Sequence, residues 1–242
     1  MNRIYSHPIM ILPSVCDATA RLSVPGAFSL FMDVATEHAD ALGISMRQIG
    51  AKGLFWLTVR TRIRFYKRPG MLESAEITTF PEDPGKLRCN RDYVLSQNGK
   101  ILIEGKTEWA ILETQTGKLH SASDIFPGDL TPEAKPVWDE PFSRISDDFS
   151  AAEAFGTYTV QSTDIDLGGH MNNAAYIRAI ASLYPCEQWN AMEIREMEAV
   201  YRAPCFEGDM LRVYRRQAEN NTDLRMANAE DQTVLLARII TA

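Results

Sequence analysis

Residues 28–42 read Phe28-Ser-Leu-Phe31-Met32-Asp-Val-Ala35-Thr-Glu-His38-Ala39-Asp-Ala-Leu42, a run in which apolar side chains recur at steps of three and four residues. That spacing puts these side chains on one face of an α-helix. Pro25 before the run and Gly43 directly after it are typical of helix boundaries. We therefore expect an amphipathic helix here, with an apolar face that must pack against another element.

The segment that follows alternates in the manner of a β-strand. Its side chains should point to two faces in turn, one with Leu57, Val59, Thr61, Ile63 and Phe65 and the other with Trp56, Arg60, Arg62 and Arg64. Further strands are predicted at residues 5–15, 76–80, 92–96 and 101–112. Asn98-Gly99, between the last two, is a strong signal for a type I′ hairpin. The first half therefore predicts one helix and an antiparallel sheet.

The second half of the chain repeats this order of elements. A strand at 155–163 and a helix at 172–184 precede strands at 197–202, 210–217, 224–227 and 234–241. The repeat predicts an α+β fold of two tandem hot-dog domains, each an antiparallel sheet wrapped around a helix. The expected divisions are an N-terminal domain at 1–126, a proline-rich linker at 127–150 and a C-terminal domain at 151–242. Two unrelated α+β modules are the alternative.

Composition limits the class of protein. The 242 residues carry a formal net charge of -7, which argues against a nucleic-acid partner. The four cysteines and four histidines are widely spaced, so we expect no disulfide framework, no metal site and no cofactor. The N-terminus lacks the apolar core of a signal peptide, and no apolar run is long enough to span a bilayer. We therefore expect a cytoplasmic protein without a membrane span.

Side chains suited to catalysis concentrate in residues 163–173, Thr-Asp-Ile-Asp-Leu-Gly-Gly-His-Met-Asn-Asn, directly before the second helix. Asn172 or Asn173 could cap that helix. The unpaired N–H groups of its first turn could stabilise the oxyanion that develops on a thioester carbonyl. His170 could orient or deprotonate a water molecule, and Asp166 could act as a base or attack directly. A polar loop that merely caps a helix is the alternative interpretation.

These residues resemble the active-site motif of the acyl-ACP thioesterases, in which D-x-D-x-N-x-H-V-N-N-x-x-Y-I opens the second hot-dog helix. The corresponding residues here are 164–177, and the likeness covers nearly the whole chain. Other similar segments are 35–43, 56–60, 91–93, 109–112 and 201–205. The resemblance implies that the second half carries the catalytic residues and that the first half shapes the choice of acyl chain.

Two positions depart from that pattern. The asparagine between aspartate and histidine is Gly168 here, so an amide that would hold the carbonyl or the water is missing. The glutamate beside the cysteine in the plant members is Pro204, whereas Cys205 is retained. Cys205 could be a nucleophile paired with histidine, or a small buried apolar side chain. Glu198, on the strand that approaches this region, is a candidate to replace the lost acid.

Binding residues can also be proposed. Arg60, Arg62 and Arg64 recur at every second position, which predicts a basic strand face that an acidic carrier protein could contact. A solvated outer face is the alternative. Four side chains are candidates to line an apolar slot for the acyl chain, although a core would need the same residues. These are Phe28, Phe31, Met32 and Trp56, with Gly168, Asn172 and Asn173 expected at the thioester.

The sequence favours hydrolysis of fatty acyl-ACP to free fatty acid and holo-ACP, with Asp166 and His170 acting at the start of the second helix. One alternative keeps the fold and changes the reaction to acyl-CoA hydrolysis or to the hydration that other hot-dog proteins catalyse. Another is a non-catalytic acyl-binding protein. The preferred chain length and a homodimeric assembly stay open at this stage.

Overall fold

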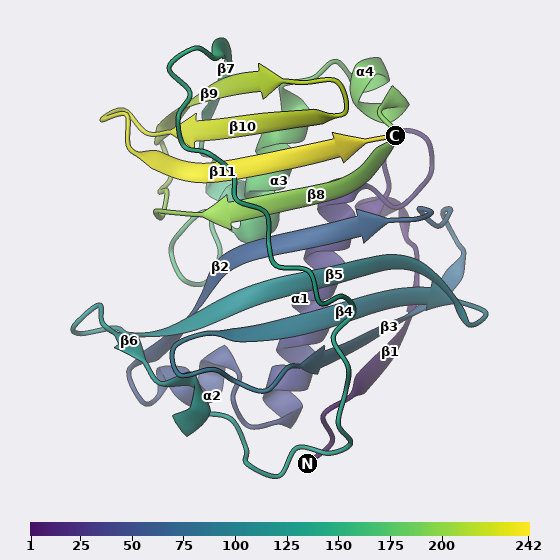
Figure 1. Cartoon of the computed structure of the whole chain (residues 1–242), viewed down its shortest axis with the longest axis vertical. Coiled ribbons are helices and arrows are strands. Elements are labelled where there is room, and N and C mark those ends of the chain that lie inside the picture. Colours follow the sequence, from purple (N-terminus) through teal and green to yellow (C-terminus); the bar gives the residue numbers. More distant parts are fainter.

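The computed structural model describes residues 1–242, and its strands belong to one sheet (Figure 1). The first half contributes β1 (Tyr5–Met10), β2 (Leu54–Phe65), β3 (Ser74–Pro81), β4 (Cys89–Gln97), β5 (Lys100–Glu113) and β6 (Leu119–His120). The second half contributes β7 (Glu153–Thr159), β8 (Ile194–Tyr201), β9 (Met210–Gln217), β10 (Asn221–Ala227) and β11 (Thr233–Thr241). The strand order is β1-β3-β4-β5-β2-β8-β11-β10-β9-β7, with β6 beside β5.

The helices lie together on one face of this sheet, behind it in Figure 1. The long ones are α1 (Val24–Ala41) and α3 (Asn173–Ser182), and the short ones are α2 (Met46–Gly50) and α4 (Cys186–Ala191). Apolar residues of α1 and α3, among them Phe31 and Ile177, belong to one continuous core. The predicted α+β double hot-dog architecture is therefore confirmed, and its two halves share a sheet and a core. No helix combines the length and apolar character that crossing a bilayer requires.

Local signals in the sequence locate most of these elements. Asn98 and Gly99 have positive φ angles of 51° and 74°, as the predicted type I′ hairpin requires. Ser23 caps α1 by accepting a hydrogen bond from the Gly26 N–H. The strand expected at 5–15 stops at Met10, because residues 13–15 form a short 3-10 helix that begins at a proline. The short elements α2, α4 and β6 were not predicted.

The two halves meet where β2 pairs with β8 in antiparallel register. The pairing runs from Arg60 opposite Val200 to Arg64 opposite Glu196. On the other side, β2 pairs along its length with β5. This seam places β2 in the middle of the combined sheet, so both halves are parts of one continuous sheet.

A β-bulge at Val59 changes which side chains of β2 face the helices. Thr58 lies opposite Trp109 of β5, but Arg60 lies opposite the next residue, Glu108, so Val59 is extra. Before the bulge, Trp56 donates to the Ile44 carbonyl on the helix side. The prediction that Trp56 shares a face with the arginines is therefore wrong, because strict alternation does not continue through a bulge.

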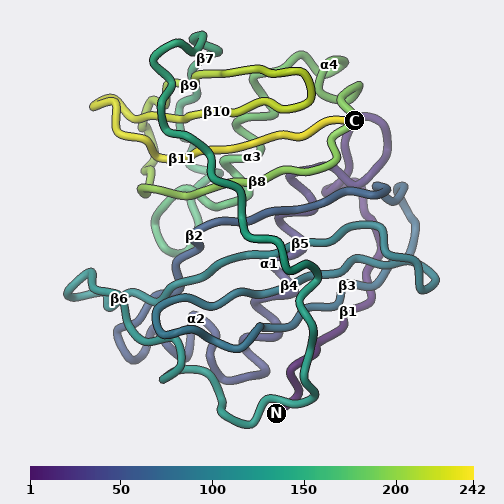
Figure 2. Tube along the Cα trace, viewed as in Figure 1, coloured from purple at the N-terminus to yellow at the C-terminus, as the bar shows by residue number.

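The segment between the 3-10 helix at 122–124 and β7 contains no helix or strand and crosses the sheet face opposite the helices (Figures 1 and 2). Although its composition is polar, this segment packs through apolar side chains, because Trp138, Ile145 and Phe149 are all buried. The Trp138 ring lies 4.6 Å from the Arg64 guanidinium, and its carbonyl accepts a hydrogen bond from Lys106. The linker therefore covers part of the second face of the sheet.

This packing predicts that the linker contributes to stability. Replacing Trp138 with alanine should lower the free energy of unfolding by about 3 kcal/mol, because it removes a buried aromatic ring and its cation–π contacts. Urea unfolding followed by circular dichroism would measure the change. The control Leu87→Ala, at an exposed loop position, should stay within about 0.5 kcal/mol of the parent protein. Equal effects of the two changes would contradict this role of the linker.

Candidate active site

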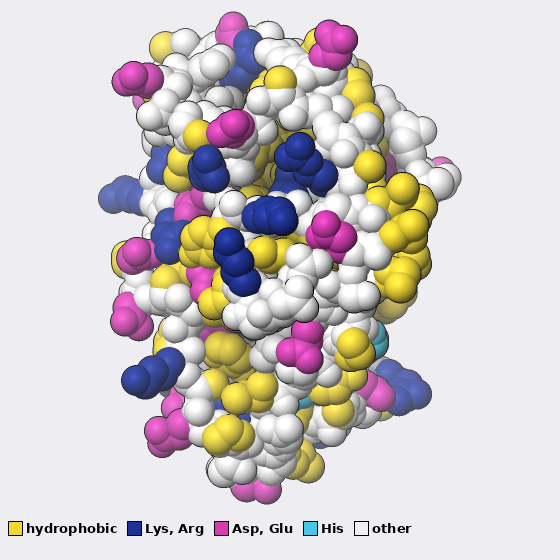
Figure 3. All heavy atoms as spheres, turned by 90° about the vertical axis from the view of Figure 1, so that its right-hand side faces the viewer, with side chains coloured by type: hydrophobic (Ala, Val, Ile, Leu, Met, Phe, Trp, Pro, Cys, Tyr) yellow, Lys and Arg dark blue, Asp and Glu magenta, His cyan; other side chains and the backbone are white.

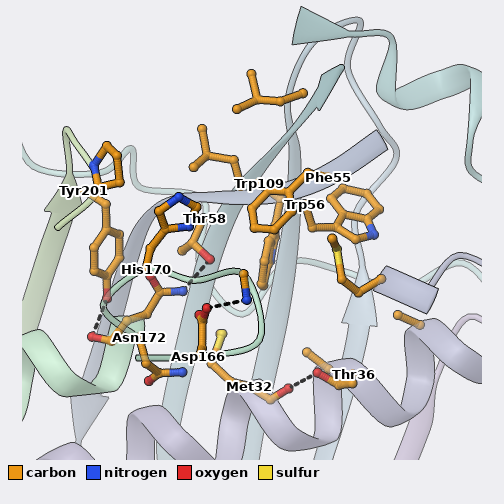
Figure 4. A pocket seen from close by; sticks show the side chains of 18 of the residues that line it. Met32, Thr36, Phe55, Trp56, Thr58, Trp109, Asp166, His170, Asn172 and Tyr201 are labelled. Atoms are coloured by element: carbon orange, nitrogen blue, oxygen red, sulfur yellow. Dashed lines mark hydrogen bonds between the residues drawn. The ribbon is translucent and has the colours of Figure 1, made fainter. Parts of the chain in front are cut away.

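A pocket of about 790 Å³ lies between the helices and the sheet and is lined by both halves of the chain (Figure 4). The first half contributes mainly apolar walls, among them Met32, Ala35, Ala39, Ile44, Trp56, Trp109 and Phe126. The second half contributes the polar residues Asp166, His170, Asn172 and Asn173. One cavity thus joins an apolar compartment to a polar end at the start of α3.

The polar loop before α3 is held by its own hydrogen bonds. The buried Asp164 carboxylate accepts from the Tyr158 hydroxyl at 2.7 Å, and its backbone carbonyl accepts from the Asn172 N–H at 2.8 Å. The Asp166 N–H donates to the His170 carbonyl at 2.9 Å. Asp164 therefore acts as the structural carboxylate of the loop, whereas Asp166 is exposed and lines the pocket.

Asp166 and Gly168 form a local turn beside a ring from the other half of the chain. Asp166 Oδ1 accepts the Gly168 N–H at 2.8 Å, which leaves Oδ2 without a protein donor. A Cβ atom added at Gly168 would lie 3.1 Å from the Phe55 ring and 3.1 Å from Asp166 Oδ1. A side chain at position 168 would therefore be crowded by Phe55, which would have to shift slightly to admit it. Phe55 was not predicted, because no local signal in the sequence connects it to this loop.

His170 is positioned by aromatic rings. Its imidazole is edge-on to Phe55, with centroids 6.3 Å apart, and lies 5.3 Å from the Phe206 ring. No protein group forms a hydrogen bond with the imidazole nitrogens. Figure 4 shows His170 and Asp166 at the same end of the pocket. The ring is therefore held in place while its nitrogens stay available to a bound molecule.

The start of α3 carries both predicted asparagines, which have different tasks. Asn172 is the N-cap, and its side-chain oxygen accepts from the Ala174 N–H at 2.9 Å. Asn173 Nδ2 donates to Thr58 Oγ1 of β2 at 2.7 Å, which ties the helix to the first half. The Asn173 N–H and Asn172 Nδ2 donate to no protein acceptor. This end of the pocket therefore offers two free donors. Thr58, like Phe55, was not predicted from the sequence.

Two of the four predicted acyl-slot residues line the pocket. Met32 and Trp56 do so, but Phe28 and Phe31 are 1% and 0% exposed and lie in the core. The prediction for Phe28 and Phe31 is wrong because they share the apolar part of α1 with Met32, and periodicity alone cannot separate the core-facing side chains from the pocket-facing ones. No group of three or more His, Cys, Asp or Glu residues has the arrangement of a metal site.

Cys205 and Glu198 do not reach the pocket. Cys205 is fully buried, and burial raises the pKa of its thiol to about 11. Glu198 is also fully buried, but on the linker side of β8, where it accepts the Ser143 N–H at 3.1 Å. Because strand side chains alternate between faces, Glu198 points away from α3. The proposal that Glu198 replaces the lost acid is therefore wrong.

The three arginines of β2 share one face, as predicted, but that face is covered by the linker. Arg62 is 8% exposed, and Glu196 of β8 bonds both Arg62 and Arg64 at 2.8 Å. Arg60 pairs with Glu108 at 3.5 Å. The expectation of a free basic face is wrong, because neighbouring carboxylates and the linker occupy it. Figure 3 shows another side of the molecule, on which Lys and Arg side chains are exposed together with Asp and Glu side chains.

The fold defines the class as a double hot-dog protein, with a pocket whose apolar walls end at a polar helix start. The sequence matches the family models of the acyl-ACP thioesterase N-terminal domain over residues 4–126 and C-terminal domain over residues 149–240. The chain therefore belongs to the acyl-ACP thioesterase family.

Individual relatives are distant. A chloroplastic acyl-[acyl-carrier-protein] hydrolase of Cuphea viscosissima is 24% identical over 201 residues, which is 78% of this chain and 48% of that protein. A chloroplastic oleoyl-acyl carrier protein thioesterase of Arabidopsis thaliana is 24% identical over 203 residues, which is 76% of this chain and 55% of that protein. The chain spans about half the length of these curated relatives.

Solved structures share the fold over the whole chain. An acyl-ACP thioesterase from Bacteroides thetaiotaomicron superposes with a TM-score of 0.88 at 23% identity, covering 99% of this chain and 98% of that one. The 12:0-ACP thioesterase from Umbellularia californica superposes with a TM-score of 0.84 at 17% identity, covering 100% and 98%. At these identities the superpositions establish the fold.

The environment of Cys205 predicts a protected thiol. With a pKa of about 11, only about one Cys205 thiol in a thousand is ionised near pH 8, and the side chain is buried. Native alkylation by iodoacetamide should therefore be at least about 100-fold slower at Cys205 than at the exposed Cys186. Peptide mass spectrometry would follow both sites, with urea-denatured protein as the control in which both react. Comparable native rates would show that Cys205 is accessible and reactive.

Proposed function

We propose that this protein hydrolyses fatty acyl thioesters carried by acyl carrier protein, releasing a free fatty acid and the carrier thiol. The observation that carries the proposal is the continuity of one pocket, which runs from an apolar compartment in the first half to Asp166, His170 and the start of α3. The family membership and the names of the two plant relatives agree with this activity.

The acyl chain is proposed to lie under α1 and the thioester to lie at α3. Met32, Ala35 and Ala39 of α1 face the same cavity as Trp56 and Trp109 of the sheet. An apolar chain gains free energy by leaving water for such walls. This arrangement supports a division of labour in which residues 1–126 select the chain and residues 151–242 carry out the reaction.

In the proposed reaction, a water molecule attacks the thioester carbonyl. Asp166 Oδ2 and the His170 imidazole are free to accept a proton from that water, because neither is used by the protein. The Asn173 N–H at the positive end of α3 and the Asn172 amide are available to stabilise the oxyanion. Collapse of the tetrahedral intermediate breaks the C–S bond, and the departing thiolate takes up a proton.

Gly168 stands where the family has an asparagine, and Phe55 lies close to the place where that side chain would begin. We propose that Asn172 supplies the amide that position 168 lacks, since Asn172 Nδ2 has no protein partner. A nucleophilic cysteine is not needed, and Cys205 is withdrawn from the pocket. The four unpaired cysteines support the cytoplasm as the proposed location.

Substrate class is tested by comparing turnover of matched acyl-ACP and acyl-CoA thioesters, with release of free thiol as the measurement. We expect kcat/KM to be higher for acyl-ACP. A preference for acyl-CoA would indicate that the protein is an acyl-CoA thioesterase. Binding of acyl chains without release of thiol from either substrate would indicate a non-catalytic protein.

The catalytic roles predict specific losses. Asp166→Asn and His170→Ala should each lower kcat by about two to four orders of magnitude. Asparagine keeps the Oδ1 acceptor that holds the Gly168 N–H, so the loop should retain its shape. Glu198→Gln is the matched control, because it neutralises a buried carboxylate on the opposite face of the sheet, and it should keep near-parent turnover. Near-parent kcat in both Asp166→Asn and His170→Ala would overturn the mechanism.

A further inference from the structure

One buried charged side chain of the pocket has no oppositely charged partner in the protein. Arg91 of β4 lines the pocket and is only 6% exposed. Its Nη1 donates to His38 Nδ1 at 2.9 Å and to Thr79 Oγ1 at 3.3 Å. Nε and Nη2, which form one edge of the guanidinium, donate to no protein atom. Arg91 also forms no ion pair with any carboxylate within 4 Å.

Arg91 differs from the other buried arginines because it has no acidic partner. The other buried arginines have acidic partners, with Arg3 paired to Asp83 at 2.7 Å and Arg62 paired to Glu196 at 2.8 Å. His38 cannot supply negative charge. Since Arg91 donates to its Nδ1, the proton is on Nε2, which donates to the Asn2 carbonyl at 3.1 Å.

Burial makes the charged form of both side chains unfavourable. Burial and the nearby guanidinium lower the pKa of His38 to about 4, so the imidazole stays neutral. Burial also lowers the pKa of Arg91, which means that the cation is held at a cost in its present surroundings. An isolated buried charge is strongly unfavourable unless a partner of opposite sign is close.

The position of Arg91 in the pocket defines where that partner would be. Thr58, at the polar end, pairs with Trp109 of β5, which pairs with Cys89 of β4. The backbones of Thr58 and Cys89 are therefore two strand spacings apart, which is roughly 10 Å. Arg91 is two residues further along β4. Between them the lining is largely apolar, and the two pocket carboxylates, Asp166 and Glu113, make their contacts elsewhere. Arg91 therefore lies in the compartment proposed for the acyl chain, away from the reacting end.

We propose that Arg91 binds a carboxylate at the far end of the acyl chain, so that the pocket accepts monothioesters of dicarboxylic acids. The free Nε and Nη2 edge can form the parallel pair of hydrogen bonds that a carboxylate makes with a guanidinium. Such a ligand supplies the missing opposite charge and satisfies both donors. An alkyl chain ending at the same place would leave them unsatisfied. The assignment of the other end of the ligand to the start of α3 rests on the proposed hydrolytic function.

A binding experiment separates this inference from hydrolysis. A fluorescent fatty acid in the pocket would be displaced by free α,ω-dicarboxylic acids, by ω-hydroxy acids and by monocarboxylic acids over a series of chain lengths. At the best length, the dicarboxylic acid should bind about 10-fold more tightly than the monocarboxylic acid. No thioester is cleaved in this assay, so loss of the proposed hydrolytic activity would leave its outcome unaffected.

Substitutions at position 91 assign the effect. Arg91→Gln should abolish the preference for the dicarboxylic acid. Arg91→Lys keeps the positive charge but lacks the paired N–H donors of a guanidinium, so it should retain part of the preference. The control Arg62→Gln removes an equally buried guanidinium from the other sheet face and should leave the preference unchanged. Binding of the monocarboxylic acid by Arg91→Gln reports that its pocket is folded.

Three results would overturn the proposal. These are a monocarboxylic preference of the parent protein at every length, a dicarboxylic preference that persists in Arg91→Gln, and an equal gain from ω-hydroxy acids. The first and third are measured on the parent protein alone, so the proposal stays falsifiable if Arg91→Gln does not fold.

Discussion

The antiparallel pairing of β2 with β8 is the interaction on which the rest of the structure depends. It joins the strands of the first half to those of the second half in one sheet. The pocket spans this seam, since Thr58 belongs to one half and Asn173 to the other. The ion pairs from Arg62 and Arg64 to Glu196 span the same two strands. Backbone bonds at the seam thus fix the distance between the apolar walls and the polar helix start.

Features that depend on short stretches of sequence could be predicted. The apolar face of α1, the Asn98-Gly99 hairpin and the Asn172 cap each follow from a local pattern, because a helix period, a positive φ or a capping side chain acts within a few residues. The two hot-dog halves could be predicted for the same reason, as each repeats the same order of local elements.

Features that depend on tertiary contacts could not be predicted in this way. Alternation predicted the shared face of Arg60, Arg62 and Arg64, but it does not reveal which segment covers that face. The bulge at Val59 reverses the side on which Trp56 lies, and only the pairing with β5 exposes it. Glu198 is close to Cys205 in sequence, yet neither reaches the pocket. Sequence proximity on a strand says little about function unless the face is known.

The candidate site illustrates the same distinction. The motif at 164–173 located Asp166, His170 and both asparagines at the pocket, since one loop and one helix start hold them together. Phe55 and Thr58 come from the other half and have no motif of their own. Their contacts with Gly168 and Asn173 involve positions more than a hundred residues apart, so a single sequence gives no sign of them.

The unequal lengths of α1 and α3, 18 and 10 residues, have a consequence for how such a pocket can evolve. In a twofold-symmetric pair of identical chains, every change in one helix is copied into the other. A covalently fused pair is free of that restriction, because each half has its own codons. One helix can lengthen to roof an apolar compartment while the other keeps a short polar start, so that substrate range and reactivity become separately mutable properties of a single gene product.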